Sequence, residues 1–265
     1  MKISNLKKLK PKDLIVFDVD GTLARTKSPM DKEMAKLVEE LLRLKKIALI
    51  GGGKYELFKY QFLNEFKAPK ELNKNLFLFP LTSTTFLRYN NGWKKVYSHN
   101  FSKAEIKKIF TAFETVFKEL DYHHPKKIYG KVIDNRGSQV TFSALGQDVV
   151  KILGKKKGVA LKDKWRDENT KLKLKMAAHL KKHLPNMEVN AAGHTSIDVT
   201  KKGIDKAYGL KQIEKYVHVP IKKMLFVGDA IFPGGNDYAA IKTGVDYIPV
   251  KGPEDTKKII RHLLA

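Results

Sequence analysis

The sequence contains no cysteine at any of its 265 positions. This absence excludes disulfides, thiolate catalysis and cysteine metal sites, and it fits a protein of the reducing cytoplasm, which is the location we expect. No apolar run reaches the roughly 18 residues that a membrane-spanning helix needs. The first thirteen residues are charged and lack the apolar core of a signal peptide, so we expect none there.

Acidic residues and arginine are scarce beside lysine. The chain has 28 Asp and Glu against 52 Lys and Arg, only six of which are Arg, and its net charge is +24. Such a charge can attract nucleic acid or another polyanion, which is one candidate function. However, the lysines are spread along the chain in short groups, and no base-reading motif is present. A lysine-coated surface with small anionic substrates explains the charge equally well, and we expect no specific nucleic-acid partner.

The two ends of the chain have an α/β pattern. Short apolar runs bounded by glycine or proline predict buried strands, and runs with helical spacing lie between them. Strands alternating with helices indicate a parallel sheet with helical crossovers. The predicted strands lie at 14–19, 47–50, 76–80 and 223–229, and the predicted helices lie around 34–42 and at 54–66 and 205–217.

The middle of the chain has a different pattern. Asn90-Asn91-Gly92 is a turn signal, residues 128–145 predict a hairpin, and helices are expected at 103–120 and 167–184. We therefore predict an α/β fold with a Rossmann-like parallel-sheet core and an inserted α+β cap domain. The core comprises residues 1–85 and 191–265, and the cap comprises residues 86–190.

Acidic residues follow two of the predicted core strands. Asp18 and Asp20 end the first strand, and Asp229 ends the strand at 223–229. Because ligands in open α/β sheets bind beyond the carboxyl ends of the strands, we expect these carboxylates to share one site. A site with only oxygen ligands favours Mg²⁺, held by a few carboxylates together with water and substrate phosphate.

These motifs resemble those of the haloacid dehalogenase (HAD) superfamily. Asp18-Val19-Asp20-Gly21-Thr22 matches its DxDGT motif, Gly228-Asp229 through Asn236-Asp237 resembles its acidic motif, and Lys206 stands in the place of its motif lysine. The position and pattern of the insert are similar to the C2B cap of subfamily IIB. Within this subfamily the chain most resembles the eukaryotic-type phosphomannomutase branch, over nearly its whole length.

The resemblance implies a role for each residue of the site. Asp18 would be the nucleophile that forms an aspartyl-phosphate, Asp20 the general acid and base, and Lys206 the balance for charge on the phosphoryl group. Mg²⁺ would be bound by Asp18, the Asp20 main chain and Asp229. Phosphate binding would fall to backbone N–H groups of Gly51, Gly52 and Gly53 and to Asn236 and Asp237, which would also orient Asp229, Lys206 or metal-bound water.

The chain departs from the mutases at several positions. Gly53 replaces a motif serine, and Gln147 and Gly154 replace two of the cap arginines that hold the second phosphate of a sugar bisphosphate. Lys27 stands where the mutases carry a core arginine, and only lysines lie close to Gly154. The substrate-binding residues would be Lys27, Arg136, Ser196 and Asp198, of which the last three match the mutases. Because lysine and arginine are not equivalent phosphate ligands, the sequence favours a Mg²⁺-dependent phosphatase of small metabolites, above all sugar phosphates. Phosphomannomutase activity is the alternative. The oligomeric state is left open, with a homodimer through the cap as one arrangement.

Overall fold

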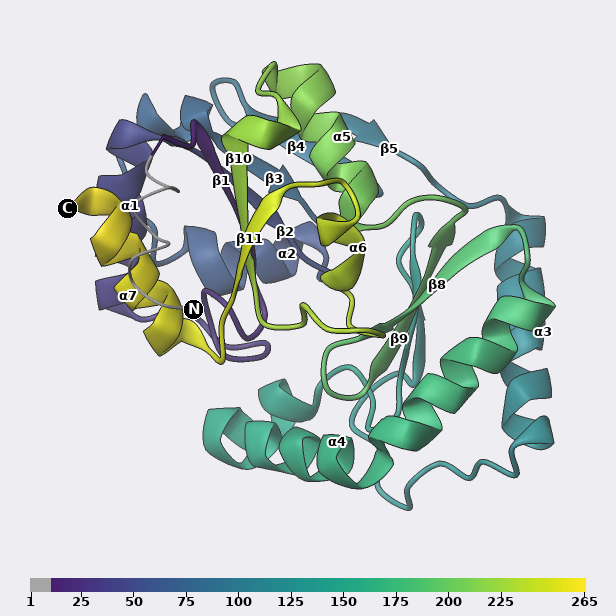
Figure 1. Ribbon diagram of the computed structural model, residues 1–265. Coiled ribbons are helices and arrows are strands. Elements are labelled where there is room, and N and C mark those ends of the chain that lie inside the picture. Colours follow the sequence, from purple (N-terminus) through teal and green to yellow (C-terminus); the bar gives the residue numbers. More distant parts are fainter. Residues whose placement is uncertain (1–10) are drawn as a thin grey trace. The chain divides into compact units, whose positions relative to one another are not determined.

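The computed structural model describes residues 11–265 and divides into two compact units (Figure 1). Unit 1 contains the described residues up to Ser98 with Asp205–Pro233 and Asp237–Ala265, and unit 2 contains His99–Ile204 with Gly234–Asn236. The absence of a signal peptide was predicted mainly on residues 1–10, which lie outside the described residues. The divisions at 98/99 and 204/205 lie later than the predicted ones at 85/86 and 190/191.

The later divisions follow from strand pairing. The hairpin around Asn90-Asn91-Gly92 pairs with the third strand of the core sheet rather than with the cap sheet. Residues 187–201 form a hairpin that pairs only within the cap sheet. The turn at Asn90-Asn91-Gly92 was predicted and the hairpin at 187–201 was not, and the sheet that each one joins depends on contacts with distant segments.

Unit 1 is built on a seven-stranded sheet with the order β11-β10-β1-β2-β3-β4-β5. The first five of these strands are parallel, as predicted, and β4 and β5 are antiparallel. The strands are β1 (Leu14–Asp18), β2 (Lys46–Ile50), β3 (Leu76–Phe79), β4 (Thr85–Tyr89), β5 (Trp93–Ser98), β10 (Met224–Gly228) and β11 (Asp246–Pro249).

Helices cover both faces of this sheet, as an α/β fold requires. Ile15 and Phe17 of β1 pack with helices α1 and α7, whereas Leu14 and Val16 pack with α5 and α6 on the opposite face. Continuous apolar strands are therefore buried on both sides, and their carboxyl ends are left to carry the polar site. The helices are α1 (Lys32–Leu44), α2 (Tyr55–Phe58), which continues as a π-helical turn (Lys59–Leu63), α5 (Lys206–Val217), α6 (Tyr238–Ile241) and α7 (Pro253–Leu264).

Unit 2 has an antiparallel four-stranded sheet with the order β6-β7-β9-β8. Val140 and Phe142 of β7 and Ile197 and Val199 of β9 pack with helices α3 and α4 in one core. The alternate positions of the same strands carry polar side chains, so the sheet has one apolar face and one polar face. The strands are β6 (Ile133–Asn135), β7 (Val140–Ser143), β8 (Met187–Ala192) and β9 (Ser196–Lys201), and the helices are α3 (Lys103–Glu119) and α4 (Val149–His183).

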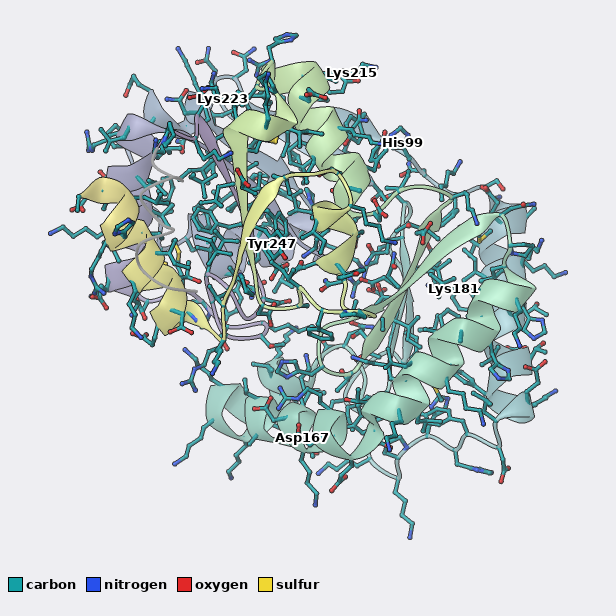
Figure 2. All side chains as sticks on the ribbon, viewed as in Figure 1. His99, Asp167, Lys181, Lys215, Lys223 and Tyr247 are labelled. Atoms are coloured by element: carbon teal, nitrogen blue, oxygen red, sulfur yellow. The ribbon has the colours of Figure 1, made fainter. Side chains whose placement is uncertain are left out.

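Helix α4 is longer than the helix predicted at 167–184. It begins at Val149, and Gly154 interrupts it with a φ of 75° and a ψ of 166°. Gly154 and Gly158 conceal the helical pattern of this segment because glycine is a poor helix former. Exposed lysines project from elements of both units, including Lys181 on α4 and Lys215 on α5 (Figure 2). Within residues 11–265, no helix has the length and apolar character needed to cross a membrane.

Candidate active site

The carboxyl ends of neighbouring strands bring the acidic motifs together. Strand β1 lies between β10 and β2, with Phe17 paired with Val227 and Asp18 paired with Ile50. Asp18 is the last residue of β1, and Asp229 directly follows β10. The parallel register therefore places the two motifs side by side at one edge of the sheet, although more than 200 residues separate them in the chain.

Three carboxylates and one ammonium form the centre of this edge. Asp18, Asp229 and Asp237 each place a carboxylate oxygen within 4.8 Å of the others. The Lys206 ammonium donates to Asp18 Oδ1 at 2.5 Å and also to Asp237 Oδ1, and the lysine side chain is fully buried. Lys206 is the first residue of α5, whose N-cap Asp205 accepts from the Tyr208 N–H. The sequence predicted Asp237 both at a phosphate and as a residue that orients Asp229, Lys206 or metal-bound water, and its carboxylate accepts from Lys206.

Two glycines make room for these carboxylates. A Cβ atom on Gly21 would lie 2.3 Å from Asp229 Oδ2, and a Cβ atom on Gly228 would lie 2.3 Å from Asp237 Oδ2. Gly21 also has a φ of +89°, a left-handed conformation that other residues adopt only with strain. The glycines beside the motif aspartates therefore allow carboxylates from other segments to reach the site.

Burial and mutual repulsion determine the pKa values in this group. Burial raises the pKa of Asp18 well above its usual value, Lys206 opposes that rise, and Asp237 and Asp229 add to it. Burial also raises the pKa of Asp229 to about 7, with Asp237 as the next cause. Burial alone would lower the pKa of the Lys206 ammonium, but Asp18 and Asp237 outweigh that effect and raise it. The group carries more negative charge than Lys206 neutralises.

This arrangement fits a hard divalent cation. Carboxylate oxygens held together at raised pKa values lose their repulsion when a cation binds between them, and an all-oxygen donor set suits Mg²⁺. The sequence assigned the metal to Asp18, Asp20 and Asp229. The structure brings Asp18 and Asp229 together and adds Asp237. The predicted contribution of Asp20 is through its main-chain carbonyl and stays a prediction.

The Asp20 carboxylate is held by two donors. Its Oδ1 accepts from the Lys27 main-chain N–H at 2.7 Å and from Gln61 Nε2 at 2.8 Å. Gln61 lies in the π-helical turn after α2 and is 1% exposed. Our sequence reasoning missed this residue, although a lone glutamine among apolar helix positions is a signal for a buried polar contact. Lys27 was predicted to bind substrate through its side chain, and the structure adds a role for its main chain.

The glycine triplet is only partly available for phosphate. The Gly51 N–H donates to the Phe79 carbonyl at 3.2 Å, because residue 51 extends the pairing of β2 with β3. The Gly51 N–H therefore already has a partner in the sheet, and the phosphate-binding role of Gly51 stays a prediction. The triplet instead supports the loop after β3, since Leu81 N–H donates to Gly53 and Thr82 N–H donates to Gly51. The predicted roles of Gly52, Gly53 and Asn236 stay predictions.

Arg136 has protein partners on two of its nitrogens. Its Nε donates to Asp134 Oδ2 at 3.0 Å, and its Nη2 donates to Gln147 Oε1 at 2.8 Å. The guanidinium lies at the turn between β6 and β7, and its side chain is 9% exposed. The mutases carry an arginine at the position of Gln147. In this chain Gln147 accepts from Arg136, which is the one cap arginine that matches a cap arginine of the mutases.

Asp198 lies in a short hydrogen-bonded chain on the polar face of the cap sheet. Gln139 Nε2 donates to Thr141 Oγ1 at 2.9 Å, and Thr141 Oγ1 donates to Asp198 Oδ1 at 2.7 Å. Asp198 is 4% exposed. Ser196 lies two residues earlier on the same strand and therefore faces the same side. The structure brings these two predicted substrate residues onto one face of unit 2.

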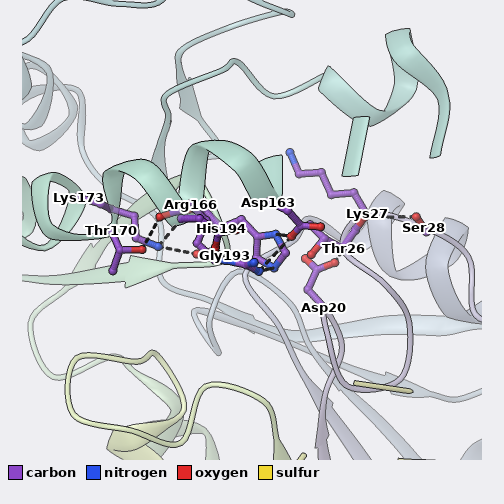
Figure 3. Close-up of polar contacts among 11 residues, drawn as sticks. Asp20, Thr26, Lys27, Ser28, Asp163, Arg166, Thr170, Lys173, Gly193 and His194 are labelled. Carbon is purple, nitrogen blue, oxygen red and sulfur yellow. Dashed lines mark hydrogen bonds and ion pairs between the residues drawn. The ribbon is translucent and has the colours of Figure 1, made fainter. Parts of the chain in front are cut away.

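The turn before Ser196 is held by residues of α4. Lys173 Nζ donates to the Gly193 carbonyl at 2.6 Å, and Asp163 Oδ1 lies 2.9 Å from His194 Nδ1 and 3.0 Å from Arg166 Nη1 (Figure 3). Burial lowers the pKa of Lys173 to about 8, with Arg166 as the next cause. These contacts fix the turn between β8 and β9, and our sequence reasoning assigned none of these residues.

A family model of haloacid dehalogenase-like hydrolases matches residues 15–243. The chain belongs to this family. The predicted superfamily is therefore confirmed, and the Asp18 cluster lies at the positions where the family motifs were recognised in the sequence. The match covers both the strand that ends in Asp18 and the segment that contains Asp237.

Relatives within the family are named phosphomannomutase. The protein of that name from Encephalitozoon cuniculi (strain GB-M1) is 27% identical over 270 residues, which cover 96% of this chain and 94% of the relative. The Saccharomyces cerevisiae phosphomannomutase is 26% identical over 265 residues, covering 97% and 96%. These full-length matches favour the mutase alternative over the phosphatase that the sequence reasoning placed first.

Solved structures with the same fold include phosphatases. The IMP-bound, N-terminally truncated Plasmodium falciparum IMP-nucleotidase matches with a TM-score of 0.73 at 17% identity, covering 98% of this chain and 71% of that one. The C-terminal domain of Candida albicans trehalose-6-phosphate phosphatase matches with a TM-score of 0.66 at 14% identity, covering 100% and 97%. At these identities the likeness concerns the fold alone.

Proposed function

We propose that this protein transfers the phosphoryl group of a hexose phosphate through Asp18, with interconversion of mannose 1-phosphate and mannose 6-phosphate as the first candidate reaction. The observation that carries the proposal is the buried Lys206 ammonium bonded to Asp18 and Asp237 beside Asp229, at the family's motif positions. The full-length likeness to phosphomannomutases supports the choice of sugar. A cytoplasmic location and a small phosphorylated substrate are parts of this proposal.

The chemistry assigns one role to each side chain. An Asp18 oxygen attacks phosphorus, the bond from phosphorus to the sugar oxygen breaks, and an aspartyl-phosphate forms. Asp20, oriented by the Lys27 N–H and Gln61, gives a proton to the departing sugar oxygen and later takes one from the acceptor. In interconversion the donor is a sugar bisphosphate and the acceptor is a hydroxyl of a sugar monophosphate, which becomes the next bisphosphate. In hydrolysis the donor is a sugar monophosphate and the acceptor is water.

Lys206 holds Asp18 in place for this attack. Its ammonium fixes one Asp18 oxygen at 2.5 Å and lies where negative charge gathers as the phosphoryl group arrives. Asp18, Asp229 and Asp237 are the side chains that would surround Mg²⁺. When bound, the cation neutralises the carboxylates and the incoming phosphate.

Hydrolysis is the second candidate, and the environment of Arg136 favours it. A mutase must hold a sugar bisphosphate while the sugar changes its orientation, and this needs a cation at the distal phosphate. Here the guanidinium is already paired with Asp134 and Gln147. A weakly held bisphosphate would leave before the second transfer, so water could become the acceptor.

A pair of assays tests the two candidates together. Phosphate release is measured from mannose 1-phosphate, mannose 6-phosphate and other sugar phosphates with Mg²⁺. Interconversion of the two mannose phosphates is measured in parallel, with and without added hexose 1,6-bisphosphate. Interconversion faster than phosphate release supports the mutase, and the reverse supports hydrolysis. No turnover of any sugar phosphate would contradict the proposed substrate class.

A further inference from the structure

The side chain of Asp134 lies in a row of polar residues across the cap sheet. Asp134 of β6 pairs with Thr141 of β7, Thr141 pairs with Asp198 of β9, and Asp198 pairs with Asn190 of β8. Residues directly opposite in neighbouring strands point to the same face. The row therefore places two carboxylates on the polar face, opposite the apolar face that packs with α3 and α4.

Arg136 adds its positive charge to this row in a fixed position. The Arg136 N–H donates to the Gln139 carbonyl at 2.8 Å, so the turn that carries the side chain is closed. Its guanidinium then reaches back two residues to Asp134, whose side chain is 14% exposed. A guanidinium and a carboxylate at this distance form a neutral pair, and an arriving anion must compete with a partner that is already in place.

Gln147 strengthens this arrangement on the other side of the guanidinium. Its side-chain oxygen accepts from Arg136 Nη2 at 2.8 Å, and its Nε2 lies 3.4 Å from the Thr141 carbonyl oxygen. A side chain held at both ends keeps its oxygen turned toward Arg136. Close to the guanidinium, an incoming phosphate would therefore meet the oxygens of Asp134 and Gln147 as well as the cation.

We propose that Asp134 keeps Arg136 neutralised and thereby determines which distal group of the substrate, a hydroxyl or a second phosphate, the cap binds. The cap then binds the hydroxyl groups of a sugar monophosphate in preference to a second phosphate. The choice of sugar phosphates as ligands rests on the proposed function. Asp198, oriented by the Thr141 hydroxyl, suits this ligand, because a carboxylate oxygen accepts hydrogen bonds from sugar hydroxyls. A bisphosphate binds only by displacing Asp134 from Arg136.

The first test follows Arg136 directly and needs no turnover. The chain has six arginines, so ¹H–¹⁵N spectra of the arginine Nε–H groups are simple, and the Arg136 signal is identified by its loss in Arg136→Gln. Inorganic phosphate is titrated into the Mg²⁺-loaded wild type and into Asp134→Asn. We expect no saturable shift of the Arg136 signal in the wild type and a saturable shift in Asp134→Asn.

Glu188→Gln is the matched control for this titration. It removes a carboxylate from β8, at the edge of the same sheet opposite β6. We expect this variant to behave as the wild type. A wild-type Arg136 signal that shifts at the same phosphate concentrations as in Asp134→Asn would overturn the proposal, whether or not the protein acts on sugar phosphates.

The second test measures selectivity by calorimetry. The ratio of the dissociation constants of hexose 1,6-bisphosphate and hexose 6-phosphate is compared among variants. Asp134→Asn should shift this ratio toward the bisphosphate by at least about fivefold, since charge-assisted hydrogen bonds are among the strong ones. The gain should vanish in Asp134→Asn/Arg136→Gln. Gln147→Glu, which adds a second carboxylate partner, should shift the ratio the other way and covers the case in which Asp134→Asn does not fold.

The outcomes separate the two proposals. An unchanged ratio in Asp134→Asn with intact folding, or a gain that survives loss of Arg136, contradicts the selectivity role of Asp134. Failure of both sugar phosphates to bind any variant contradicts the proposed substrate class, and in that case the arginine spectra alone decide the role of Asp134.

Discussion

The two charged clusters of this protein differ in whether their positive and negative charges balance. In unit 1, three clustered carboxylates have Lys206 bonded to two of them, and burial raises the pKa of Asp229 to about 7. In unit 2, Arg136 is matched by Asp134 and by the oxygen of Gln147. The first cluster has more carboxylates than ammonium groups, and in the second one guanidinium is balanced by one carboxylate.

This difference indicates where each cluster gains stability. A cluster with uncompensated carboxylates is stabilised when a cation or a proton arrives, which suits a site that must bind Mg²⁺ and a phosphate. A guanidinium paired with a carboxylate is already stable, and separating the two groups costs free energy. The excess of charge in unit 1 is therefore expected to be functional, and the balance in unit 2 is expected to limit what binds there.

Loss of the nucleophile should have the largest effect. Asp18→Asn removes both the attacking oxygen and a charged partner of Lys206, and we expect turnover of sugar phosphates to fall at least about a thousandfold, or ~4 kcal/mol in the barrier. The matched control is Asp13→Asn, an exposed aspartate just before the same strand, which should retain full turnover. Steady-state rates with Mg²⁺ provide the measurement, and circular dichroism checks the fold. Residual activity within about tenfold of the wild type would contradict the role of Asp18 as the nucleophile.

Removal of one carboxylate from each cluster should change stability in opposite directions. Asp229→Asn relieves an uncompensated charge, so in EDTA at pH 8 it should raise the free energy of unfolding by roughly 2–4 kcal/mol. Asp134→Asn leaves a buried guanidinium without its carboxylate and should lower it by about 1–3 kcal/mol. Urea unfolding of the two variants and the wild type measures both. Destabilisation by both variants would contradict the view that the Asp229 cluster has excess negative charge whereas the charges around Arg136 balance.

Mg²⁺ affinity should depend on pH because the cation competes with a proton on Asp229. The pKa of Asp229 in the metal-free protein is about 7, so below this value Mg²⁺ must displace a proton. We expect the association constant to rise by up to about tenfold per pH unit from pH 5.5 to 7 and then to level off. Calorimetric titration in buffers of different ionisation enthalpy also counts the released proton.

The same pKa determines the sign of the pH dependence of stability. Asp229 has a higher pKa in the folded protein than in the unfolded chain, so the folded state binds more protons between about pH 4 and 7. Its contribution to the free energy of unfolding in EDTA should therefore fall as pH rises through this window. Asp229→Asn should remove that part of the slope. Two results together would contradict the raised pKa of Asp229. These are a Mg²⁺ affinity that does not depend on pH, and the same slope of unfolding free energy against pH in Asp229→Asn as in the wild type.

The smallest of these effects should come from a methyl group. Gly228→Ala places a Cβ atom 2.3 Å from Asp237 Oδ2 and should weaken Mg²⁺ binding by about fivefold, or ~1 kcal/mol. The control is Gly252→Ala, where a Cβ atom meets nothing within 4 Å. Calorimetry gives both affinities. Equal affinities for Gly228→Ala and the wild type would show that the cluster relaxes easily around the added methyl.

The α/β pattern, the inserted cap and the acidic strand ends could be predicted because they are local. Continuous apolar runs such as 14–19 form buried strands wherever they lie, and in a parallel sheet their carboxyl ends must meet at one edge. Asp18 and Asp229 were placed together on that basis, and the family motifs added Lys206. The amino-acid sequence by itself thus determined the type of fold, the family and the residues at the centre of the site.

Tertiary structure alone decided the partners of these residues. Gln61 as a donor to Asp20, and Asp134 and Gln147 as acceptors for Arg136, depend on distances between side chains. Sequence pattern records which face a residue occupies, but hydrogen bonds and charge pairs require positions correct to within about half an ångström. Such positions are fixed only when distant segments pack together, and this is why charge excess in one unit and charge balance in the other could not be predicted from the sequence.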